Sequence, residues 1–410
     1  MCSPRLDLCA CARAALLAAL LFSTPLFAAD DDYDLAPEPP LELRALLDVR
    51  VGRPGRATAW TDRGPGKTRF GGKLVGTNFR HVTDVDLAQF AVEVSADLPA
   101  GIVARAQLDL ETSADIEWRP LLVDAYLRRE WGEPVRGWGV QAGVMNVPFS
   151  LEHTGPAWTP AYTLTPSALG TWTWEEGRLT GIEAEGWQRG PWGSRLYVLG
   201  GAGFGADQAG ILLAQRGWVL SDYLTGVNAS LPLPAAGATT SVFDERDLRP
   251  ALYCMVAADD PWKLGSLRIG YFDNLGDTSH AGVWRTRFGT VGVDLHPLPH
   301  VDLVAQYLAG ATERAGLADD SRFGAGYLMF SFHLGGHRLS VRYDNFRVRD
   351  LDGPPDTTER GDAVTIAYLF AFGLHHRLGV EYMLIDSRHP SLFSGDPPDD
   401  GWQISYRYRF

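Results

Sequence analysis

The chain has 410 residues, of which 45% are hydrophobic and 11% aromatic, with 45 glycines and a formal net charge of −13 at pH 7. The acidic balance excludes nucleic acid as an expected partner. The moderate hydrophobic content argues against a bundle of membrane helices, but it is compatible with a β-barrel, in which only every second residue of a strand meets lipid.

The first 29 residues have the pattern of a secretory signal peptide. Arg5 and Arg13 precede an apolar run at 14–22, and small residues at 28–29 offer a cleavage site. The run has about half of the ~20 residues that a membrane-spanning helix needs, which favours cleavage over an uncleaved anchor. We therefore expect residues 1–29 to direct the chain through the Sec export route and to be removed.

The stretch 30–40 is acidic and rich in proline, and it reads as a short periplasmic lead-in. The remainder, 41–410, is expected to form a single domain. Cys254 is the one cysteine left after the signal peptide, which excludes an internal disulfide framework. No later segment reaches the roughly 18 consecutive apolar residues of a membrane-spanning helix.

From residue 41 onward, apolar and polar side chains alternate over short stretches. In 41–51, leucine, alanine and valine take every second position, and Arg44, Asp48 and Arg50 lie between them. This period predicts strands with one apolar face. Sixteen stretches carry the pattern: 41–51, 87–98, 102–111, 121–131, 137–147, 178–187, 194–202, 250–257, 266–274, 285–295, 301–309, 323–333, 338–347, 362–372, 376–386 and 401–410. Most have roughly the 9–11 residues that a tilted strand needs to cross a bilayer.

The connections between these strands alternate in length. Short ones fall at 99–101, 132–136, 188–193, 296–300, 334–337 and 373–375. Long ones fall at 52–86, 148–177, 203–249, 310–322, 348–361 and 387–400. Short periplasmic turns and longer outside loops give this rhythm, and an even strand count places both termini on the periplasmic side. The predicted fold class is all-β: a transmembrane antiparallel β-barrel of 16 strands with inward-folded loops.

Two of the long connections are candidates for the barrel interior. Sixteen strands leave a lumen too wide for wall side chains to fill. Loop 148–177 is aromatic and carries few charges, so we expect it to fold inward and form a constriction. Loop 203–249 is long enough to be a second lumen loop or an extracellular one.

The last strand carries a stripe of large apolar residues. Trp402, Ile404, Tyr406, Tyr408 and Phe410 take alternate positions, with arginines between some of them. In a transmembrane barrel such a stripe faces lipid. A terminal phenylalanine preceded by aromatic residues resembles the signal by which the barrel assembly machinery recognises bacterial outer-membrane proteins. Tyr406, Tyr408 and Phe410 are therefore the candidate insertion signal.

Two further motifs carry a family resemblance. The segment "GVMNVPFSLE" at 143–152, followed by a stretch rich in serine and threonine, and "LSVRYDNFRV" at 339–348, resemble the phosphate-selective porin O and P family. The resemblance implies a trimeric, 16-stranded channel for small anions in the outer membrane of a Gram-negative bacterium. In that family phosphate selectivity relies on lysines and an arginine ladder in the lumen, whereas this chain has only Lys67, Lys73 and Lys263, none of them in the candidate constriction loop. The phosphate preference is therefore not carried over with the fold.

A set of charged residues is the candidate pore lining. The candidates are Arg44, Arg105, Arg128, Glu152, His153, Arg342 and Arg407. We expect arginines of the early strands and of the adjoining last strand to form a basic wall opposite Glu152, which would orient passing solutes. The alternative is that these charges pair laterally and only solvate the lumen.

The sequence thus predicts a porin for passive diffusion of small hydrophilic solutes or ions, including anions such as phosphate. The alternatives are a plugged surface barrel that acts as an adhesin or structural protein, and a secreted soluble β-rich enzyme. The enzyme has little support, because no catalytic, metal or cofactor motif is present. Expected partners besides the solutes are outer-membrane lipid, lipopolysaccharide that meets acidic loops at 350–356 and 395–401 through divalent cations, the assembly machinery, and two further copies in a homotrimer.

Overall fold

The computed structural model describes most of the chain after residue 40. The described ranges are 41–75, 78–110, 120–191, 194–235, 237–259, 264–314, 320–351, 358–389 and 399–410. The expected signal peptide and lead-in lie outside the described residues. None of the described helices is long and apolar enough to cross a membrane.

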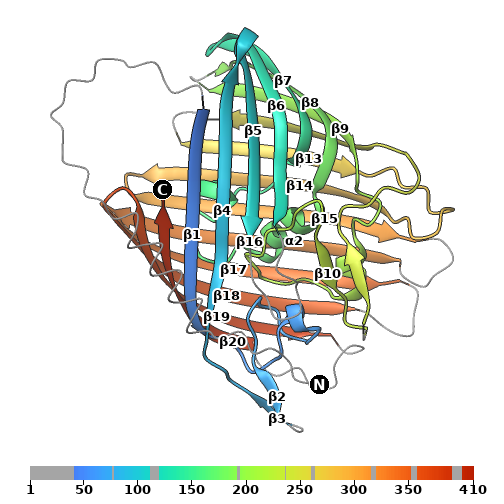
Figure 1. Ribbon diagram of the computed structural model, residues 1–410, viewed down its shortest axis with the longest axis vertical. Helices are drawn as coiled ribbons and strands as arrows, with labels where there is room; N and C mark the ends of the chain where they lie inside the picture. Colours follow the sequence, from blue (N-terminus) through green and yellow to red (C-terminus); the bar gives the residue numbers. More distant parts are fainter. Residues whose placement is uncertain are drawn as a thin grey trace. The chain divides into compact units, whose positions relative to one another are not determined.

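Sixteen strands form one closed antiparallel barrel (Figure 1). The barrel strands are β1 (Leu41–Arg53), β4 (Asp84–Leu98), β5 (Ile102–Leu110), β6 (Leu121–Glu133), β7 (Arg136–Asn146), β8 (Arg178–Arg189), β9 (Arg195–Phe204), β12 (Ala251–Asp259), β13 (Gly265–Asp273), β14 (Arg285–Leu298), β15 (Val301–Glu313), β16 (Ser321–Leu334), β17 (His337–Asp350), β18 (Glu359–Phe372), β19 (His376–Arg388) and β20 (Asp399–Arg409). Each pairs with its neighbour along the chain, and β1 pairs with β20 to close the ring. The predicted fold class and strand count are confirmed.

The period-2 pattern explains why these stretches form barrel strands. In β17, Leu339, Val341 and Tyr343 are exposed on the outside, while Arg342 and Asp344 are buried inside. A sheet that exposes large apolar side chains in this regular way meets lipid rather than water. β20 follows the same rule: the aromatic stripe of the last strand lies on the outer face of the barrel.

Several strands extend beyond their predicted ends. The predicted strand 338–347 becomes His337–Asp350, and 301–309 becomes Val301–Glu313. The additional residues lie mostly at the ends joined by long connections, which we call the loop end; the opposite end is the turn end. The alternation of polar and apolar residues is weaker at the loop end, because the strands there extend beyond the part of the barrel that faces lipid.

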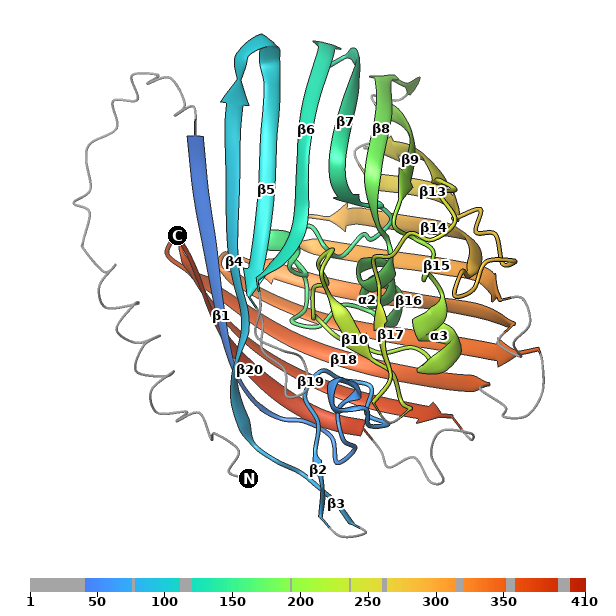
Figure 2. The ribbon, with the colours of Figure 1, turned by 45° about the vertical axis from the view of Figure 1, so that its right-hand side comes forward.

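The remaining elements are short, and nearly all lie in the long connections. They are η1 (Trp60–Asp62), β2 (Lys73–Val75), β3 (Asn78–Arg80), η2 (Pro99–Gly101), η3 (Pro156–Trp158), α2 (Ala168–Glu176), α3 (Ile211–Gln215), β10 (Ser230–Pro232) and β11 (Thr239–Ser241). Figure 2 shows α2 and α3 on the inner side of the strands, where α2 contacts β16 and α3 contacts β17.

Candidate functional site

The interior of the barrel is the candidate functional site, and three long connections occupy much of it. They run over 54–83, 147–177 and 205–250. Each contributes side chains that are almost fully buried, among them Trp60, Trp172 and Trp218. The two loops singled out in the sequence, 148–177 and 203–249, therefore both lie largely inside the ring of strands.

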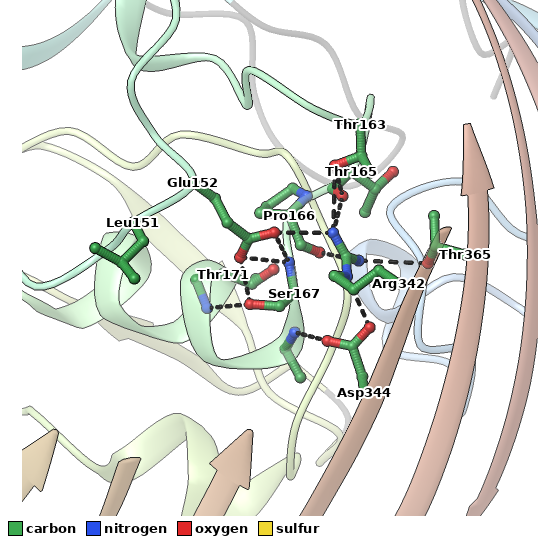
Figure 3. A network of polar contacts seen from close by, with 12 residues as sticks. Leu151, Glu152, Thr163, Thr165, Pro166, Ser167, Thr171, Arg342, Asp344 and Thr365 are labelled. Atoms are coloured by element: carbon green, nitrogen blue, oxygen red, sulfur yellow. Dashed lines mark hydrogen bonds and ion pairs between the residues drawn. The ribbon is translucent and has the colours of Figure 1, made fainter. Parts of the chain in front are cut away.

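Connection 147–177 leaves β7 and returns to β8, yet it is bonded to the opposite wall. In the ring of 16, β17 lies eight strands from β7 in either direction. Arg342 of β17 donates from Nη1 to Glu152 at 2.9 Å and from Nε to Asp344 at 2.8 Å (Figure 3). Its guanidinium also donates to the main-chain oxygens of Thr165 at 2.8 Å and Pro166 at 3.0 Å. The loop is thus tied across the full width of the barrel.

This anchor is a buried charge network at the start of α2. Arg342, Glu152 and Asp344 are each no more than 1% exposed. The main-chain N–H of Ser167 donates to Glu152, and that of Ala168 donates to Asp344, so carboxylates satisfy free N–H groups at the helix N-terminus. Burial raises the pKa of Glu152, and the charge of Arg342 opposes that rise. Removing one partner from such a network costs about 3–5 kcal/mol, because the other charges stay buried.

Glycines on the inner wall make room for the loop. A Cβ on Gly379 would lie 2.7 Å from a Leu164 methyl, and one on Gly270 would lie 2.6 Å from the Phe149 ring. Both glycines sit at inward positions of their strands. The close approach of loop to wall therefore depends on the absence of side chains at these positions.

One half of the lumen is dry. Trp172 of α2 packs its ring 5.1 Å from Phe288, 5.1 Å from Phe323 and 5.8 Å from Trp218, measured between ring centroids. The cluster continues along the inner face of β12–β19, with these wall residues: Ala251, Tyr253, Met255, Phe272, Phe288, Leu308, Phe323, Ala325, Phe346, Val348, Ala363, Met383 and Ile385. Polar groups on the inner face of the same strands, such as Gln306, Arg342 and Glu359, are bonded to the lumen loops. We therefore expect an aqueous path to follow the other half.

Alternation of side chains does not reveal the dry half, but an apolar segment of the sequence does. The segment 323–330 reads "FGAGYLMF" and has almost no polar residue on either face. A strand that is apolar on both sides is typical of burial on both sides. Such runs predict a wall that is covered by lipid outside and by a packed loop inside.

Connection 205–250 packs on α2 from the loop end. Glu176 accepts from the main-chain N–H of Gly210 at 2.9 Å and of Leu212 at 3.1 Å, at the start of α3. Glu175 forms a buried ion pair with Arg216 at 2.7 Å. Burial raises the pKa of Glu176 to about 7. Two adjacent carboxyl groups at the end of α2 thus hold the second lumen loop in place.

Connection 54–83 is joined to both the wall and the second loop. Lys67 reaches Glu359 of β18 at 2.5 Å, and its main-chain oxygen accepts from the N–H of Leu220 at 2.7 Å. Asp222 of the second loop pairs with Arg50 of β1 at 2.7 Å. The three connections therefore form one layer across the loop end of the lumen.

The wall of β1, β19 and β20 carries a strip of buried polar side chains, which we call the polar seam. Its members are Asp48, Arg50, Glu381, Gln403 and Arg407, all no more than 6% exposed. Arg407 donates to Asp48 at 2.6 Å, and Arg50 donates to the same carboxylate at 3.1 Å. Gln403 donates to Glu381 at 2.7 Å. The seam is the polar counterpart of the dry half.

Open space lies mainly at the turn end of the lumen. A first chamber of about 430 Å³ is lined by residues that include Asp124, Arg128, His153, Glu183 and Glu185. A second chamber of about 770 Å³ is lined by residues that include Arg44, Glu93, Arg105, Trp158 and Arg409.

A third, much smaller cavity lies on the loop side of the seam. This loop-end pocket of about 30 Å³ is lined in part by Arg69, Thr165, Asp222 and Gln403, and it has room for about two water molecules. On β1 the second chamber reaches Leu46 and the pocket begins at Gly52. The rungs of the seam that carry Asp48 and Arg50 separate the two spaces.

The predicted site residues are distributed over these spaces. Arg44 is exposed and pairs with Glu42 at 2.7 Å. Arg105 pairs with Glu93 at 3.1 Å and lies over the ring of Trp158. These arginines line the second chamber, and their carboxylate partners lie on the same or the neighbouring strand.

Arg128 and His153 line the first chamber. Arg128 bonds to Glu185, and the His153 ring lies 4.8 Å from that of Trp174 and 2.8 Å from the Ser150 hydroxyl. Burial lowers the pKa of His153 to about 3, so the ring is neutral.

The expected pairing of Glu152 with a basic wall of early-strand arginines and Arg407 differs from the structure. Glu152 meets Arg342, which the sequence placed among the candidates, and it meets neither Arg105 nor Arg128 in the described residues. Arg407 lies in the polar seam beside Asp48. The seam residues Asp48, Glu381 and Gln403 were not predicted as a group, because only barrel closure brings β1 and β19 to either side of β20.

The candidate insertion signal faces outward. Tyr406 and Phe410 are 36% and 38% exposed. The Tyr406 hydroxyl lies 2.8 Å from Nδ1 of His376 on the neighbouring strand. On the outer surface these side chains can contact lipid or another protein where β20 pairs with β1.

Solved structures similar to this chain are outer-membrane channels. The outer-membrane channel DcaP of Acinetobacter baumannii has a TM-score of 0.55 at 13% identity, covering 90% of this chain and 97% of that one. An anion-selective porin from Comamonas acidovorans has a TM-score of 0.54 at 12% identity, with 90% and 99% covered. Salmonella typhi OmpF, in a complex with daunomycin, has a TM-score of 0.54 at 12% identity, with 90% and 97% covered. The sequence matches no protein-family model and no curated protein. At these identities the likeness establishes a porin fold.

Proposed function

We propose that this chain is an outer-membrane porin through which small hydrophilic solutes or ions diffuse, and that their path follows the polar seam. The observation that carries the proposal is the seam itself. It lies between the second chamber at the turn end and the loop-end pocket, inside a barrel of porin fold. A passive channel needs a continuous line of polar groups that can replace water around a solute, whereas polar groups in the dry half are bonded to the lumen loops.

The seam is closed by its own ion pairs in this conformation. Asp48 accepts from Arg407 and Arg50, and Ser405 donates to it at 2.6 Å. Passage requires these side chains to part. The seam therefore supports transport of small solutes and single ions rather than of bulky molecules.

The charge balance of the seam does not support a phosphate site. Along the seam and the loop-end pocket, positive and negative groups balance: Arg50, Arg69, Arg377 and Arg407 lie among Asp48, Asp222, Glu381 and Asp399. Arg377 favours anions weakly, because its Nε and Nη2 are buried and find no hydrogen-bond partner among the described residues. We propose a channel with weak charge selectivity.

The plugged barrel is the second candidate, and the layer of three connections favours it. The buried cluster around Trp172 and the Arg342 network leave no cavity through the centre of the described lumen. A barrel with this interior would conduct nothing.

Single-channel recording in a planar bilayer separates the two candidates. We expect discrete current steps for the purified chain. The double substitution Asp48→Asn with Arg407→Gln removes the central ion pair of the seam and should increase the step size. The control Arg44→Gln changes an exposed arginine at the mouth and should leave the step unchanged. Absence of any steps in the unaltered chain contradicts the channel, and steps that ignore the double substitution contradict the seam as the path.

The remaining expectations from the sequence form part of the same proposal. They are export to the outer membrane of a Gram-negative bacterium, insertion by the barrel assembly machinery, and assembly as a homotrimer. The lipid-facing stripe on β20 and the short turns at the end that holds Phe410 support the first two. Fractionation with a salt wash tests the location, and gel filtration in mild detergent tests the oligomer.

A further inference from the structure

An unusual group of arginines lies on the outer surface of the barrel at the loop end. We call it the arginine band. Its members are Arg287 of β14, Arg322 of β16, Arg347 and Arg349 of β17, Arg360 of β18 and Arg388 of β19. All six occupy outward positions and are exposed.

The register of the sheet brings like charges directly opposite one another. Arg360 is paired with Arg347 on one side and with Arg388 on the other, so three guanidinium groups share one rung. Arg322 is paired with Arg349 on the next rung toward the loop end. Neighbouring strands lie ~4.8 Å apart, and like charges directly opposite destabilise a sheet. The band is therefore an arrangement that the barrel itself does not stabilise.

Carboxylates of the barrel do not neutralise the band. Within the described part of the chain, none of the six arginines forms an ion pair. Asp362 and Asp386 face outward one rung below. Asp362 accepts from the Asn345 amide at 2.8 Å and from the Tyr343 hydroxyl. Among the described residues, the positive charge of the band is therefore left without a carboxylate partner.

Below the band, the same strands present a continuous apolar surface. Rungs closer to the turn end carry paired, mostly exposed apolar side chains: Leu328, Phe330, Val341, Tyr343, Val364, Ile366, Tyr382 and Leu384. From the rung of Arg347 to that of Tyr343 is four residues, or about 13 Å of strand. The order along the strand is thus cationic, then polar and acidic, then apolar, with Tyr343 at the boundary where interfacial aromatic residues are found.

We propose that the arginine band binds the phosphate-bearing headgroup of an outer-leaflet lipid, whose acyl chains lie on the apolar surface below. Guanidinium groups bind phosphate oxygens in a bidentate manner and stay charged at every relevant pH. One rung with three arginines, backed by two on the next, matches a multiply charged headgroup of the lipopolysaccharide type. The continuous apolar surface favours a lipid over free phosphate. The inference rests on the proposed function only in that the barrel stands in the outer membrane, and it does not require a conducting channel.

This surface is a contact with lipopolysaccharide distinct from the acidic loops expected from the sequence. The loops at 350–356 and 395–401 lie mostly outside the described residues. A direct contact between arginine and phosphate needs no divalent cation, so a chelator should not abolish it.

Native mass spectrometry of the full barrel in detergent tests the proposal. The probes are a bisphosphorylated glucosamine lipid and its dephosphorylated counterpart with the same acyl chains. The unaltered chain should retain the phosphorylated probe at least about tenfold more strongly, since hydrogen bonds between guanidinium and phosphate are charge-assisted. The triple substitution Arg347→Gln, Arg360→Gln and Arg388→Gln should abolish this difference, also in the presence of a chelator.

The matched control substitutes three arginines at the turn end, Arg129, Arg136 and Arg189, by glutamine, and it should bind like the unaltered chain. Should the triple variant assemble poorly, the single variant Arg360→Gln removes the centre of the rung and should lose part of the preference. Equal retention by band and control variants overturns the proposal, as does equal binding of the two probes. Complete displacement by inorganic phosphate would assign the band to free phosphate instead. Conductance should not change in either triple variant, which separates this test from that of the channel.

Discussion

Replacing Arg342 by methionine tests whether the buried network holds the constriction loop. The substitution keeps a long side chain but removes the partner of Glu152 and Asp344, which lie 2.9 and 2.8 Å from the guanidinium. Two carboxylates would then share a buried space without a cation. Breaking a buried pair costs about 3–5 kcal/mol, so we expect a marked loss of stability in mild detergent.

The assay is the temperature at which the folded band on a gel gives way to the unfolded one, combined with single-channel recording. A matched control is Arg338→Met, on the same strand and also inward-facing. Arg338 pairs with Asp302 at 2.6 Å, but its side chain is 25% exposed, and partly exposed pairs contribute about 0–1 kcal/mol. Arg342→Met should lower the transition far more than the control and make the current noisier, because the loop is freed from β17.

A double substitution tests whether Arg342 and Glu152 act together. Adding Glu152→Gln to Arg342→Met removes one of the two stranded carboxylates, so it should restore part of the lost stability. Coupling of this kind between neighbours typically amounts to about 0.5–3 kcal/mol. If Arg342→Met and Arg338→Met melt at the same temperature, or if Glu152→Gln only adds to the loss, the network does not anchor the loop and the reasoning fails.

Four further predictions follow from other parts of the molecule. Burial raises the pKa of Glu176 from 4.5 to about 7, so its contribution to anchoring the second loop is complete below pH 4.5 and lost as pH rises through about 7. Current noise should rise over this pH range, and Glu176→Gln should remove that pH dependence. Trp172→Ala should cost about 3–5 kcal/mol of stability, measured by the same gel transition, whereas Trp138→Ala on the lipid side should cost much less. Asp48→Asn leaves the seam with an excess of arginine and should shift the reversal potential in a salt gradient toward anions, an effect that vanishes in molar salt if it is electrostatic. Phe410→Asp places a charge in the lipid-facing stripe and should reduce the amount of barrel in the outer membrane; normal accumulation would contradict its role as insertion signal.

The barrel could be predicted from the sequence, because the alternation of side chains is a local property. Stretches such as 41–51 and 338–347 show it without knowledge of their neighbours. The partner of Glu152 could not be predicted in the same way. Which strand lies across from a loop depends on tilt and register summed over the whole ring, and Arg342 is only one of several inward arginines. The polar seam depends on closure between the first and last strands, which is the longest-range contact in the chain.

The dry half of the lumen has a consequence for how this protein is made. If the barrel closed before Trp172 is seated, the apolar cluster on its inner wall would be left in water, at a cost of about 25 cal/mol per Å² of apolar area. The segment that carries Trp172 must therefore be seated while the later strands are still being added. Assembly then has an order: connection 147–177 enters the lumen before the ring of strands around it is complete. An excised loop would accordingly yield a chain that fails to mature, not a wider pore.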